Sequence, residues 1–376
     1  MPDRYDVIVV GSGPAGGSAA FFLGEAGRRV LVLEKASLPR YKTCGGAVSL
    51  RVLQQFPFSF EPVIQSKVQA ISYVLGRKMV TIPLKDSSLC MVMRAEFDAY
   101  LMAHAKAELR ENTTVRSVKE KEDSVIVETT TGEQFEADYL IAADGANSVV
   151  ARSLNLRRKK KLAGAIEIEA TIPQETLTRF ANTPMLIFGE IGIGYLWIFP
   201  KFDHLSVGIG GLNPKPGELQ AVLEQVMTRL GISLHGQPRA GHPLPIYTAH
   251  EPINTRRCLL VGDAAGLVDP FTGEGIRFAI KSGRLAAESL LAAQPEHYGA
   301  LVNQLIGRNH RLGSMLTTLF YQLPGTSFDL ALRNPALSRA LGKMVDDRIG
   351  YGQLMLETAL AFPRFVLTKK IELKTV

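Results

Sequence analysis

The chain has 376 residues, which exceeds the size at which a single hydrophobic core keeps growing, so two or more subdomains are expected. With 46% hydrophobic residues, 21% charged residues and 34 glycines, its composition is that of an ordinary globular protein and excludes a disordered, collagenous or coiled-coil chain. Its 43 basic and 36 acidic residues give a net charge of +7. That charge is compatible with an acidic partner or a membrane surface but identifies neither.

The cysteines and histidines are too scattered for a metal site. Cys44, Cys90 and Cys258 include no CxxC pair, and the seven histidines have no metal-ligand spacing. We therefore expect no metal, no disulfide framework and a reducing compartment. No apolar stretch of about 18 residues lacks a charge or turn signal, and the polar start of the chain is unlike a signal peptide. The expected location is the cytoplasm, with no transmembrane helix.

The start of the chain carries the strongest motif. The apolar run Tyr5–Val10 predicts a buried parallel strand, and a Gly-rich turn separates it from a helical stretch at Ser18–Ala26. The turn has GxGxxG spacing: Gly11 permits the tight turn, Gly13 lets the backbone approach a pyrophosphate, and Gly16 lets helix and strand pack closely. The helix start would add N–H groups and a positive dipole end for phosphates.

An acidic residue completes this motif. The second apolar run, Val30–Leu33, predicts a strand that ends at Glu34, 18 positions after Gly16. A carboxylate at that place can accept hydrogen bonds from a ribose diol. An acid also disfavours a 2′-phosphate, so the motif predicts an FAD or NAD site and not an NADP site.

A second Gly-rich region favours FAD over NAD. The apolar strand 257–261 precedes Gly262–Gly266 (GDAAG), and a loop leads to Gly273–Ile276 (GEGI), where a helix is expected to run to about residue 293. Asp263 would hydrogen-bond a polyol chain, and the helix start would place N–H groups near the N1–C2=O edge of an isoalloxazine ring. The alternative is an ordinary strand, loop and helix with glycine caps. It explains each glycine separately but does not explain why all of these residues occur together.

Several motifs together resemble known flavoprotein families. GSGPAGGSAA at the start, DGANS at Asp144–Ser148 and GDAAGLVDPFTGEGI at Gly262–Ile276 resemble the fingerprints of FAD-dependent enzymes with the para-hydroxybenzoate hydroxylase-type fold. PRYKTCGGAVS at Pro39–Ser49 and GYLWIFPK at Gly194–Lys201 are similar to motifs of the geranylgeranyl reductase family. Members of that family carry a Cys-Gly-Gly loop near the flavin and a YxWxFP strand in the substrate cavity. The C-terminal stretch after about residue 293 matches only in being helical and apolar.

The resemblance implies a set of cofactor contacts. Arg94 begins a predicted helix, where its guanidinium can pair with a phosphate, although spacing alone favours a solvated arginine. Val118 would offer only backbone atoms to the adenine. Cys44 is the candidate catalytic residue only through an expected position near the flavin N5, and no proton transfer is assigned to it. The implied FAD contacts are Ala15, Glu34, Cys44, Gly45, Ala47, Arg94, Val118, Asp263, Gly275 and Ile276. The motif residues Gly11, Gly13, Gly16 and Asp144 complete the expected cofactor set.

Three aromatic residues alternate in the second family motif. Tyr195, Trp197 and Phe199 must share one face of a strand because successive side chains point to opposite faces. Spacing alone favours an ordinary core. The resemblance favours the wall of a cavity for a long apolar substrate, and the three residues are therefore the expected substrate-binding set.

The expected fold class is mixed, α/β with α+β, and comprises three regions. A Rossmann-like FAD-binding domain with a parallel sheet is expected from residues 1–60, 94–160 and 253–296, with a small antiparallel unit at 115–137 and a return to the main sheet at 139–143. An antiparallel-sheet substrate domain is expected from residues 61–93 and 161–252, with most of its strands at 164–212 and a helix at 215–230. A C-terminal helical region is expected from 297–376, broken at Pro324, Pro335 and Pro363.

Two basic segments have alternative interpretations. Arg157–Lys161 (RRKKK) is either a solvated loop or a dock for an acidic electron donor or NADPH phosphates. Residues 300–376 carry 10 Lys and Arg against 5 Asp and Glu, and include the apolar stretch 354–370 flanked by bases. This stretch is either a helical cap or a surface that rests on anionic lipid as a peripheral membrane contact.

The combined features predict an FAD-dependent oxidoreductase that reduces C=C bonds of a polyprenyl, geranylgeranyl-type substrate by hydride transfer from reduced flavin. NADPH or another reductant would supply electrons, and no nucleic-acid partner is expected. The alternative is an FAD-dependent monooxygenase, hydroxylase or halogenase of the same fold that uses O2 and NAD(P)H. A flavin-free dinucleotide-binding or lipid-carrier protein is the third class. The sequence does not identify the group that donates the proton.

Overall fold

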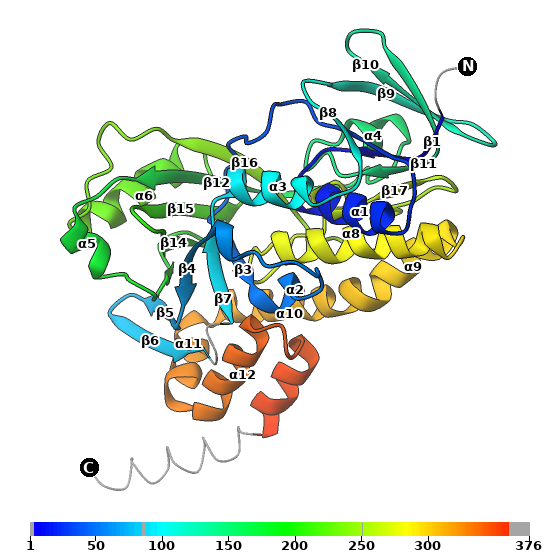
Figure 1. Ribbon diagram of the computed structural model, residues 1–376. Coiled ribbons are helices and arrows are strands. Elements are labelled where there is room, and N and C mark those ends of the chain that lie inside the picture. The colour runs from blue at the N-terminus through cyan, green and yellow to red at the C-terminus, as the bar shows by residue number, and fades with distance from the viewer. Residues whose placement is uncertain (1–3, 85–87, 250, 361–376) are drawn as a thin grey trace, which may run out of the picture. The chain divides into compact units, whose positions relative to one another are not determined.

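The computed structural model describes residues 4–84, 88–249 and 251–360. The chain divides into two compact units, each built from separate segments. The first unit comprises Met1–Lys42, Met93–Leu162 and Pro243–Arg311, and the second comprises Thr43–Val92, Ala163–His242 and Leu312–Val376. The mixed fold class expected from the sequence is confirmed, with a largely parallel sheet in the first unit and a mainly antiparallel sheet in the second (Figure 1).

The unit edges differ from the expected domain edges in three main places. Residues 243–252, expected with the substrate domain, belong to the first unit. Residues 43–60, expected with the cofactor domain, belong to the second unit, because strand β3 (Ala47–Ser49) pairs there with β7 (Leu89–Val92). The region from 297 onward is divided at Arg311. Its first part stays with the first unit, where the Tyr298 hydroxyl donates to the Leu260 carbonyl at 2.8 Å.

The main sheet of the first unit has the strand order β8-β2-β1-β11-β10-β9, and β17 pairs with the end of β11. The pairings β8–β2–β1–β11–β17 are parallel, whereas β9 and β10 are antiparallel. The order reverses beside β1, which in open α/β sheets is where ligands bind, at the carboxyl ends of the strands. The strand bounds are β1 Tyr5–Val10, β2 Val30–Leu33, β8 Glu108–Arg110, β9 Val115–Glu120, β10 Val125–Thr129, β11 Gln134–Ala142 and β17 Cys258–Leu260.

Strand β11 differs from its expected form. The sequence predicts a short antiparallel strand to residue 137 and a separate return to the main sheet from 139, because Asp138 and Glu136 interrupt the apolar run. The structure shows one continuous strand that pairs with β10 in its first half and with β17 in its second. Asp138 is tolerated in the middle because Arg4 forms an ion pair with its exposed carboxylate at 2.6 Å.

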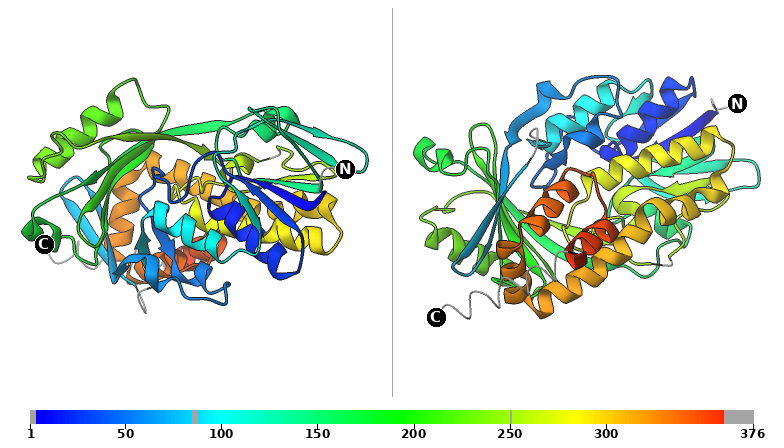
Figure 2. Two further views of the ribbon diagram at one scale, coloured as in Figure 1. Left: turned by 45° about the horizontal axis from the view of Figure 1, so that its top comes forward. Right: turned by 90° about the horizontal axis from the view of Figure 1, so that it is seen from below.

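Two helices of the first unit lie side by side, as Figures 1 and 2 show. A Cβ on Gly283 of α8 would lie 2.2 Å from the Ala15 carbonyl oxygen of α1, so this close contact requires glycine. The Ser18 hydroxyl donates to the Ile280 carbonyl across the same contact at 3.0 Å. The helices and turns of this unit are α1 Pro14–Glu25, α3 Arg94–Ala103, α4 Val149–Ser153, α7 Gly262–Ala265, α8 Ile276–Leu291, η3 Pro295–His297, α9 Tyr298–Val302 and η4 Asn303–Gly307.

The second unit is built on a sheet with the order β16-β12-β15-β14-β13-β5-β6, antiparallel in its printed pairings except for the parallel pair β13–β5. A smaller sheet has the order β3-β7-β4. The remaining strand bounds are β4 Ile64–Val68, β5 Ala70–Leu75, β6 Lys78–Pro83, β12 Lys161–Ala170, β13 Met185–Phe188, β14 Gly194–Pro200, β15 Leu205–Leu212 and β16 Ala240–Ile246.

The two faces of the larger sheet differ. One face packs its apolar side chains, among them Leu196, Ile198 and Val207, against the buried side of helix α6 (Glu218–Arg229). The alternate residues of the same strands therefore point to the opposite face. The other helices that contribute to this unit are α2 Leu50–Leu53, η1 Glu61–Val63, α5 Gln174–Thr178, α10 Arg308–Gln322, α11 Pro324–Arg333 and α12 Pro335–Val345.

The C-terminal helices begin where the prolines predict. Pro324 and Pro335 are the first residues of α11 and α12, and Asn334 caps α12 by accepting from the Ala336 amide at 3.0 Å. The chain is again helical at 351–360. Pro363 and most of the basic apolar stretch 354–370 lie outside the described residues. Within the described part of the chain, no helix is long and apolar enough to span a membrane.

Candidate functional site

The turn after β1 can be built only with glycines. Gly11 has φ +98°, and a Cβ on it would lie 2.5 Å from the Ala143 carbonyl oxygen. A Cβ on Gly16 would lie 1.9 Å from the carbonyl oxygen of Gly11. Gly13 is the N-cap of α1, and no side chain caps this helix start. The first N–H groups of α1 therefore point out of the turn without a side-chain acceptor, which is the usual form of an anion site.

Two arginines lie beside this helix start. The Asp98 carboxylate is completely buried and accepts two hydrogen bonds from Arg94, both at 2.8 Å, and one from Arg40 at 3.1 Å. A Cβ on Gly13 would be 3.7 Å from Nη2 of Arg94 and 3.8 Å from Nη2 of Arg40. Asp98 thus holds two guanidinium groups against the Gly-rich turn, where their N–H groups can pair with a pyrophosphate.

Glu34 ends β2 and is buried. One of its oxygens accepts from the Ser12 amide at 2.9 Å and the Ser12 hydroxyl at 2.6 Å, and the other pairs with Arg40 at 3.5 Å. Burial alone would raise the pKa of Glu34, but the Ser12 hydrogen bonds and the Arg40 charge hold the pKa below its ordinary value. A ribose diol would therefore meet an ionised carboxylate that it shares with Ser12 and Arg40.

Asp263 follows β17 and has an open carboxylate. It is half-buried, and none of the described residues donates a hydrogen bond to its side chain. A Cβ on Gly275, the N-cap of α8, would lie 3.6 Å from its Oδ1. Burial raises the pKa of Asp263, against the opposing charges of Lys42 and Arg94. This acceptor, next to a helix start without a side-chain cap, fits a polyol chain and the polar edge of a ring.

Asp144 and Val118 also form hydrogen bonds with their surroundings. One oxygen of Asp144 accepts from the amides of Val149 and Val150 at 2.7 and 3.2 Å, at the start of α4. Its other oxygen is buried and has no partner among the described residues. The Val118 amide, on β9, donates to the Ser153 hydroxyl at 3.3 Å. Asp144 therefore stabilises the start of α4 with one oxygen, and its other oxygen can still accept a hydrogen bond.

The first unit brings most of the expected cofactor residues together. Three features suit a dinucleotide with a polyol linker. They are the open faces of two glycines, the cations beside one helix start and the unpaired carboxylate oxygens. The residues gathered there are Gly11, Gly13, Ala15, Gly16, Glu34, Arg94, Val118, Asp144, Asp263, Gly275 and Ile276. Cys44, Gly45 and Ala47 belong to the second unit.

The basic run 157–161 is not a wholly solvated loop. Arg157 is only 2% exposed, donates to the Ala265 carbonyl, and lies where a Cβ on Gly266 would overlap its guanidinium. Lys160 donates to the Ala146 carbonyl at 3.0 Å. The solvated interpretation is therefore wrong for Arg157, because its charge is used inside the fold to hold the loop after β17.

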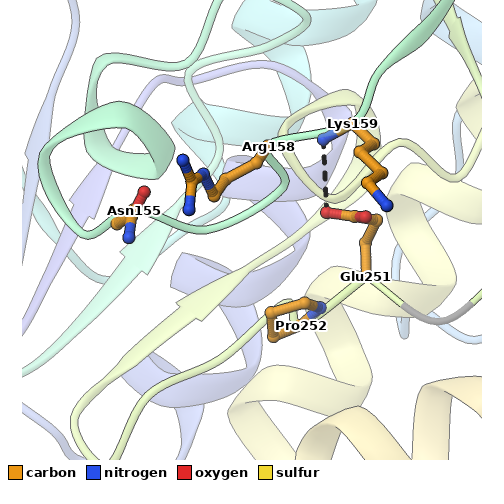
Figure 3. Close-up of a pocket in the computed structure, with 5 residues that line it drawn as sticks. All are labelled: Asn155, Arg158, Lys159, Glu251 and Pro252. Carbon is orange, nitrogen blue, oxygen red and sulfur yellow. Dashed lines mark hydrogen bonds between the residues drawn. The ribbon is translucent and has the colours of Figure 1, made fainter.

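Two more basic side chains of this run, Arg158 and Lys159, line a pocket. Figure 3 shows Arg158 and Lys159 with Asn155, Glu251 and Pro252 around a space of about 590 Å³. The Lys159 amide donates to the Glu251 carboxylate at 3.3 Å. The pocket thus carries charges of both signs.

The aromatic residues of β14 share one face, as expected. The rings of Tyr195 and Trp197, and those of Trp197 and Phe199, have centroids 6.4 Å apart. Trp197 pairs with Gly208 of β15, and a Cβ on Gly208 would lie 2.2 Å from an indole carbon. The indole therefore lies flat over bare backbone, and its Nε1 has no hydrogen-bond partner among the described residues. We call Tyr195, Trp197 and Phe199 the aromatic row.

The Cys-Gly-Gly loop packs against the aromatic row. A Cβ on Gly45 would lie 2.8 Å from the Phe199 ring and 3.0 Å from Trp197 Nε1. The Lys201 ammonium holds the loop by donating to the Gly45 carbonyl at 2.7 Å and to the Val92 carbonyl at 3.0 Å. Cys44 is half-buried, whereas Cys90 and Cys258 are fully buried. Ala47 begins strand β3 at the end of this loop. The second unit thus brings together Cys44, Gly45 and Ala47 with the aromatic row.

Sequence reasoning missed several residues that shape these sites. Asp98 lies four positions after Arg94 in a predicted helix, and that spacing already indicates an ion pair. Arg40 and Lys201 stand inside the quoted family motifs but received no role. Glu167, which is 0% exposed, was read only as part of a strand, although an acid in an apolar alternating run is itself a signal.

Comparison with known proteins places the chain in a family. The model of the FAD binding domain family matches residues 4–183. The chloroplastic geranylgeranyl diphosphate reductase of Oryza sativa subsp. japonica is 32% identical, over 77% of this chain and 67% of its own length. The geranylgeranyl diphosphate reductase of Rhodobacter capsulatus is 30% identical, over 77% and 75%.

A solved structure agrees in fold. The geranylgeranyl bacteriochlorophyll reductase-like protein of Thermoplasma acidophilum superimposes with a TM-score of 0.80 over 98% of this chain and 99% of its own, at 22% identity. The fold class, the domain match and the identity to these relatives agree with the motifs. The chain therefore belongs to the geranylgeranyl reductase family and is an FAD-dependent oxidoreductase.

Proposed function

We propose that this enzyme saturates C=C bonds in the polyprenyl chain of a geranylgeranyl-type lipid. The observation that carries the proposal is the aromatic row with the Cys-Gly-Gly loop packed on it, because this apolar surface suits an isoprenoid chain. The names of the two reductase relatives support the same substrate class. Tyr195, Trp197 and Phe199 are the proposed substrate-binding residues.

The first unit is proposed to bind FAD, which supplies hydride chemistry after two-electron reduction. Gly13, with the start of α1, and the guanidinium groups of Arg40 and Arg94 would bind the pyrophosphate. Glu34 would accept from the ribose and Asp263 from the polyol chain. Asp144, Val118 and the start of α8 at Gly275 and Ile276 complete the proposed set in this unit, and Cys44, Gly45 and Ala47 are the proposed contacts from the Cys-Gly-Gly loop.

The chemistry makes two demands on the protein. An isolated C=C bond is a poor hydride acceptor, so a proton must be available close by as the hydride is transferred. Water must also be kept away from the reacting bond. The aromatic row suits the second demand, since the Trp197 ring lies against the backbone of Gly208 and the Phe199 ring against Gly45.

The electron donor and the location are also proposals. NADPH or another reductant would reduce the flavin, and Arg158 and Lys159 at the pocket of Figure 3 are candidate contacts for its phosphates. We propose a cytoplasmic enzyme that meets its lipid by peripheral contact with a membrane.

The substrate class can be tested on the holoenzyme. Protein reconstituted with FAD is incubated with geranylgeranyl diphosphate and dithionite without oxygen, and the lipid is analysed by mass spectrometry. The expected product has gained two hydrogens for each bond reduced. A product that forms only with O2 and NAD(P)H and contains oxygen or halogen would establish the monooxygenase or halogenase alternative instead. A folded protein that binds no flavin would refute both.

A further inference from the structure

Two glutamates share the face of the aromatic row. On β12 and β15, Glu167 pairs with Gly208 and Glu169 pairs with Ser206. On β15 and β14, the same Gly208 pairs with Trp197 and the same Ser206 pairs with Phe199. Directly paired residues of antiparallel strands point to the same face of a sheet. Glu167 and Glu169 therefore lie on the same face as the aromatic row, together with Ser206.

The glutamates belong to a group of polar residues that reaches the surface. The Ser206 hydroxyl donates to Glu167 Oε1 at 3.2 Å, the other Glu167 oxygen is buried without a partner among the described residues, and the neighbouring carboxyl of Glu169 acts on Glu167 by its charge. Nε2 of His204 lies 3.0 Å from Glu169, and its Nδ1 lies 2.6 Å from Asp203. Asp203 is 76% exposed, so this end of the group is in water.

Lys201 lies beside these residues, because its backbone amide donates to the His204 carbonyl at 2.9 Å. The Lys201 side chain is only 3% exposed, and its ammonium holds the Cys-Gly-Gly loop through the Gly45 carbonyl. Its charge interacts with Glu169 and Glu167 on one side and with Cys44 on the other. Lys201 thus lies between the acid pair and the loop. We call Lys201, Glu167, Glu169 and His204 the acid–base cluster.

Burial sets the protonation of this cluster. Burial, with the charge of Glu169, raises the pKa of Glu167 to about 9. Burial would also raise the pKa of Glu169, but its hydrogen bond to His204 and the charge of Lys201 hold it below its ordinary value. Burial lowers the pKa of Lys201, and the bonds to Glu169 and Asp203 outweigh burial and raise that of His204. At neutral pH the acid pair therefore holds one proton.

The other titratable groups facing the cluster are few. Cys44 and Cys90 face Lys201 from the loop and from β7, and Glu61 and Lys67 act in turn on Cys90. Burial raises the pKa of Cys90 to about 12, so this thiol stays neutral across the working range. The acid pair is thus the group of carboxyls whose charge acts on Lys201 and which holds a proton at neutral pH.

We propose that the acid–base cluster carries the proton that each C=C reduction consumes, from water at His204 to the Cys-Gly-Gly loop at Lys201. In the balanced step, reduced flavin gives one hydride, with its electron pair, to one alkene carbon and is oxidised. The other carbon takes a proton from the Nζ end of the cluster. Lys201 regains its proton from the acid pair, the pair from His204, and His204 from solvent. This inference rests on the proposed function.

The test follows a single turnover. Holoenzyme with prereduced flavin is mixed with geranylgeranyl diphosphate without oxygen, and flavin reoxidation is followed across pH in H2O and D2O. Because a positioned acid or base typically contributes 10²- to 10⁴-fold, Glu169→Gln should slow reoxidation about 10²-fold and increase the solvent isotope effect. His204→Ala should also be slow, and added imidazole should restore its rate because this end of the cluster reaches solvent. The matched control, Glu190→Gln, changes a carboxylate of the same unit that pairs with Arg229 outside the cluster, and should react like wild type.

A structural explanation is tested in the same proteins. Cys44 is the half-buried cysteine of the chain and the other two are buried, so its alkylation rate reports the state of the loop. The proposal expects slow reoxidation together with unchanged alkylation. Wild-type rates in Glu169→Gln and His204→Ala would overturn it, as would slow variants with altered alkylation and no response to imidazole. If the lipid does not reoxidise the flavin of the wild-type enzyme, that result refutes the proposed function, and with it the inference that rests on it.

Discussion

Glycines make room for different partners in the two units. In the first unit, the open side of Gly13 meets the ends of two arginine side chains. In the second, Gly45 and Gly208 meet the rings of Phe199 and Trp197. The same residue type therefore prepares one surface for an anion that must approach the backbone closely, and another for a flat apolar contact.

Buried charge is balanced differently as well. Asp98 and Glu34 hold Arg40 and Arg94, so two negative charges face two positive charges beside a helix start. Lys201 faces two glutamates that share a proton at neutral pH. The first arrangement balances its charges with fixed ion pairs, whereas the second holds a proton on its acid pair. Two buried ion groups can therefore differ in whether one of their acids is protonated at neutral pH.

Removing the shared carboxylate of the first unit should have the largest effect. Asp98→Ala removes the buried carboxylate that Arg94 pairs with and leaves Arg40 with Glu34 alone, and breaking a buried pair typically costs about 3–5 kcal/mol. We expect the free energy of unfolding, measured with urea, to fall by that order and FAD occupancy to be lost. Asp138→Ala, which breaks the exposed pair with Arg4, should cost no more than about 1 kcal/mol. Equal costs in the two variants would contradict the role given to Asp98.

Removing the open acceptor of the first unit should affect the cofactor and leave the fold intact. Asp263→Ala deletes a half-buried carboxylate with no donor in the described structure, so stability should change little. FAD binding should weaken by about 1–3 kcal/mol if the polyol chain is its partner. Titration of apoprotein with FAD measures this loss directly. An unchanged dissociation constant would reject Asp263 as a cofactor contact.

The aromatic row can be displaced without removing a ring. Gly208→Ala places a Cβ 2.2 Å from the indole and 2.5 Å from the Ile166 carbonyl oxygen, and such overpacking typically costs about 1–3 kcal/mol. We expect this variant and Trp197→Ala to lose lipid turnover while flavin is still reduced by dithionite. Equal losses of lipid turnover and of flavin reduction by dithionite would indicate a folding defect. That result would contradict a role of the aromatic row in lipid binding alone.

The raised pKa of Glu167 should make the free energy of unfolding fall as the pH rises. In the folded protein Glu167 keeps its proton up to about pH 9, whereas an unfolded glutamate releases it near 4.5. The folded state therefore binds the extra proton between these values, so this contribution to stability is complete below about 4.5 and is lost as the pH rises through 9. Glu167→Gln should flatten the decline by up to about 1.4 kcal/mol per pH unit, measured by urea unfolding at several pH values. Parallel pH profiles for variant and wild type would contradict a proton on Glu167.

The sequence predicts the first unit's site better than the second's. Gly11, Gly13, Gly16 and Glu34 follow from local spacing, since a strand, a tight turn and a helix fix their positions relative to one another. The partnership of Arg40 with Asp98 joins residues 58 positions apart, so it requires the packed fold. Likewise the aromatic row follows from alternation on one strand, but its glutamates come from a strand two places away in the sheet.

Other differences have the same origin. Arg157 belongs to a run of basic residues of a kind that usually lies in solvent. Its burial follows from its contact with the loop after β17, which the sequence pattern does not predict. The expected edge near residue 60 was too late because the pairing of β3 with β7 draws the Cys-Gly-Gly loop into the second unit. Local sequence patterns thus predict helices and strands, whereas pairing between distant strands decides to which unit each of them belongs.

The central claim is that the flavin of this enzyme reduces an alkene without oxygen. The most direct test mixes stoichiometric, prereduced holoenzyme with geranylgeranyl diphosphate in the absence of both oxygen and excess reductant. We expect the flavin to become oxidised and one C=C bond to be saturated for each flavin oxidised. A flavin that stays reduced with the lipid and is oxidised only when oxygen is admitted would contradict it.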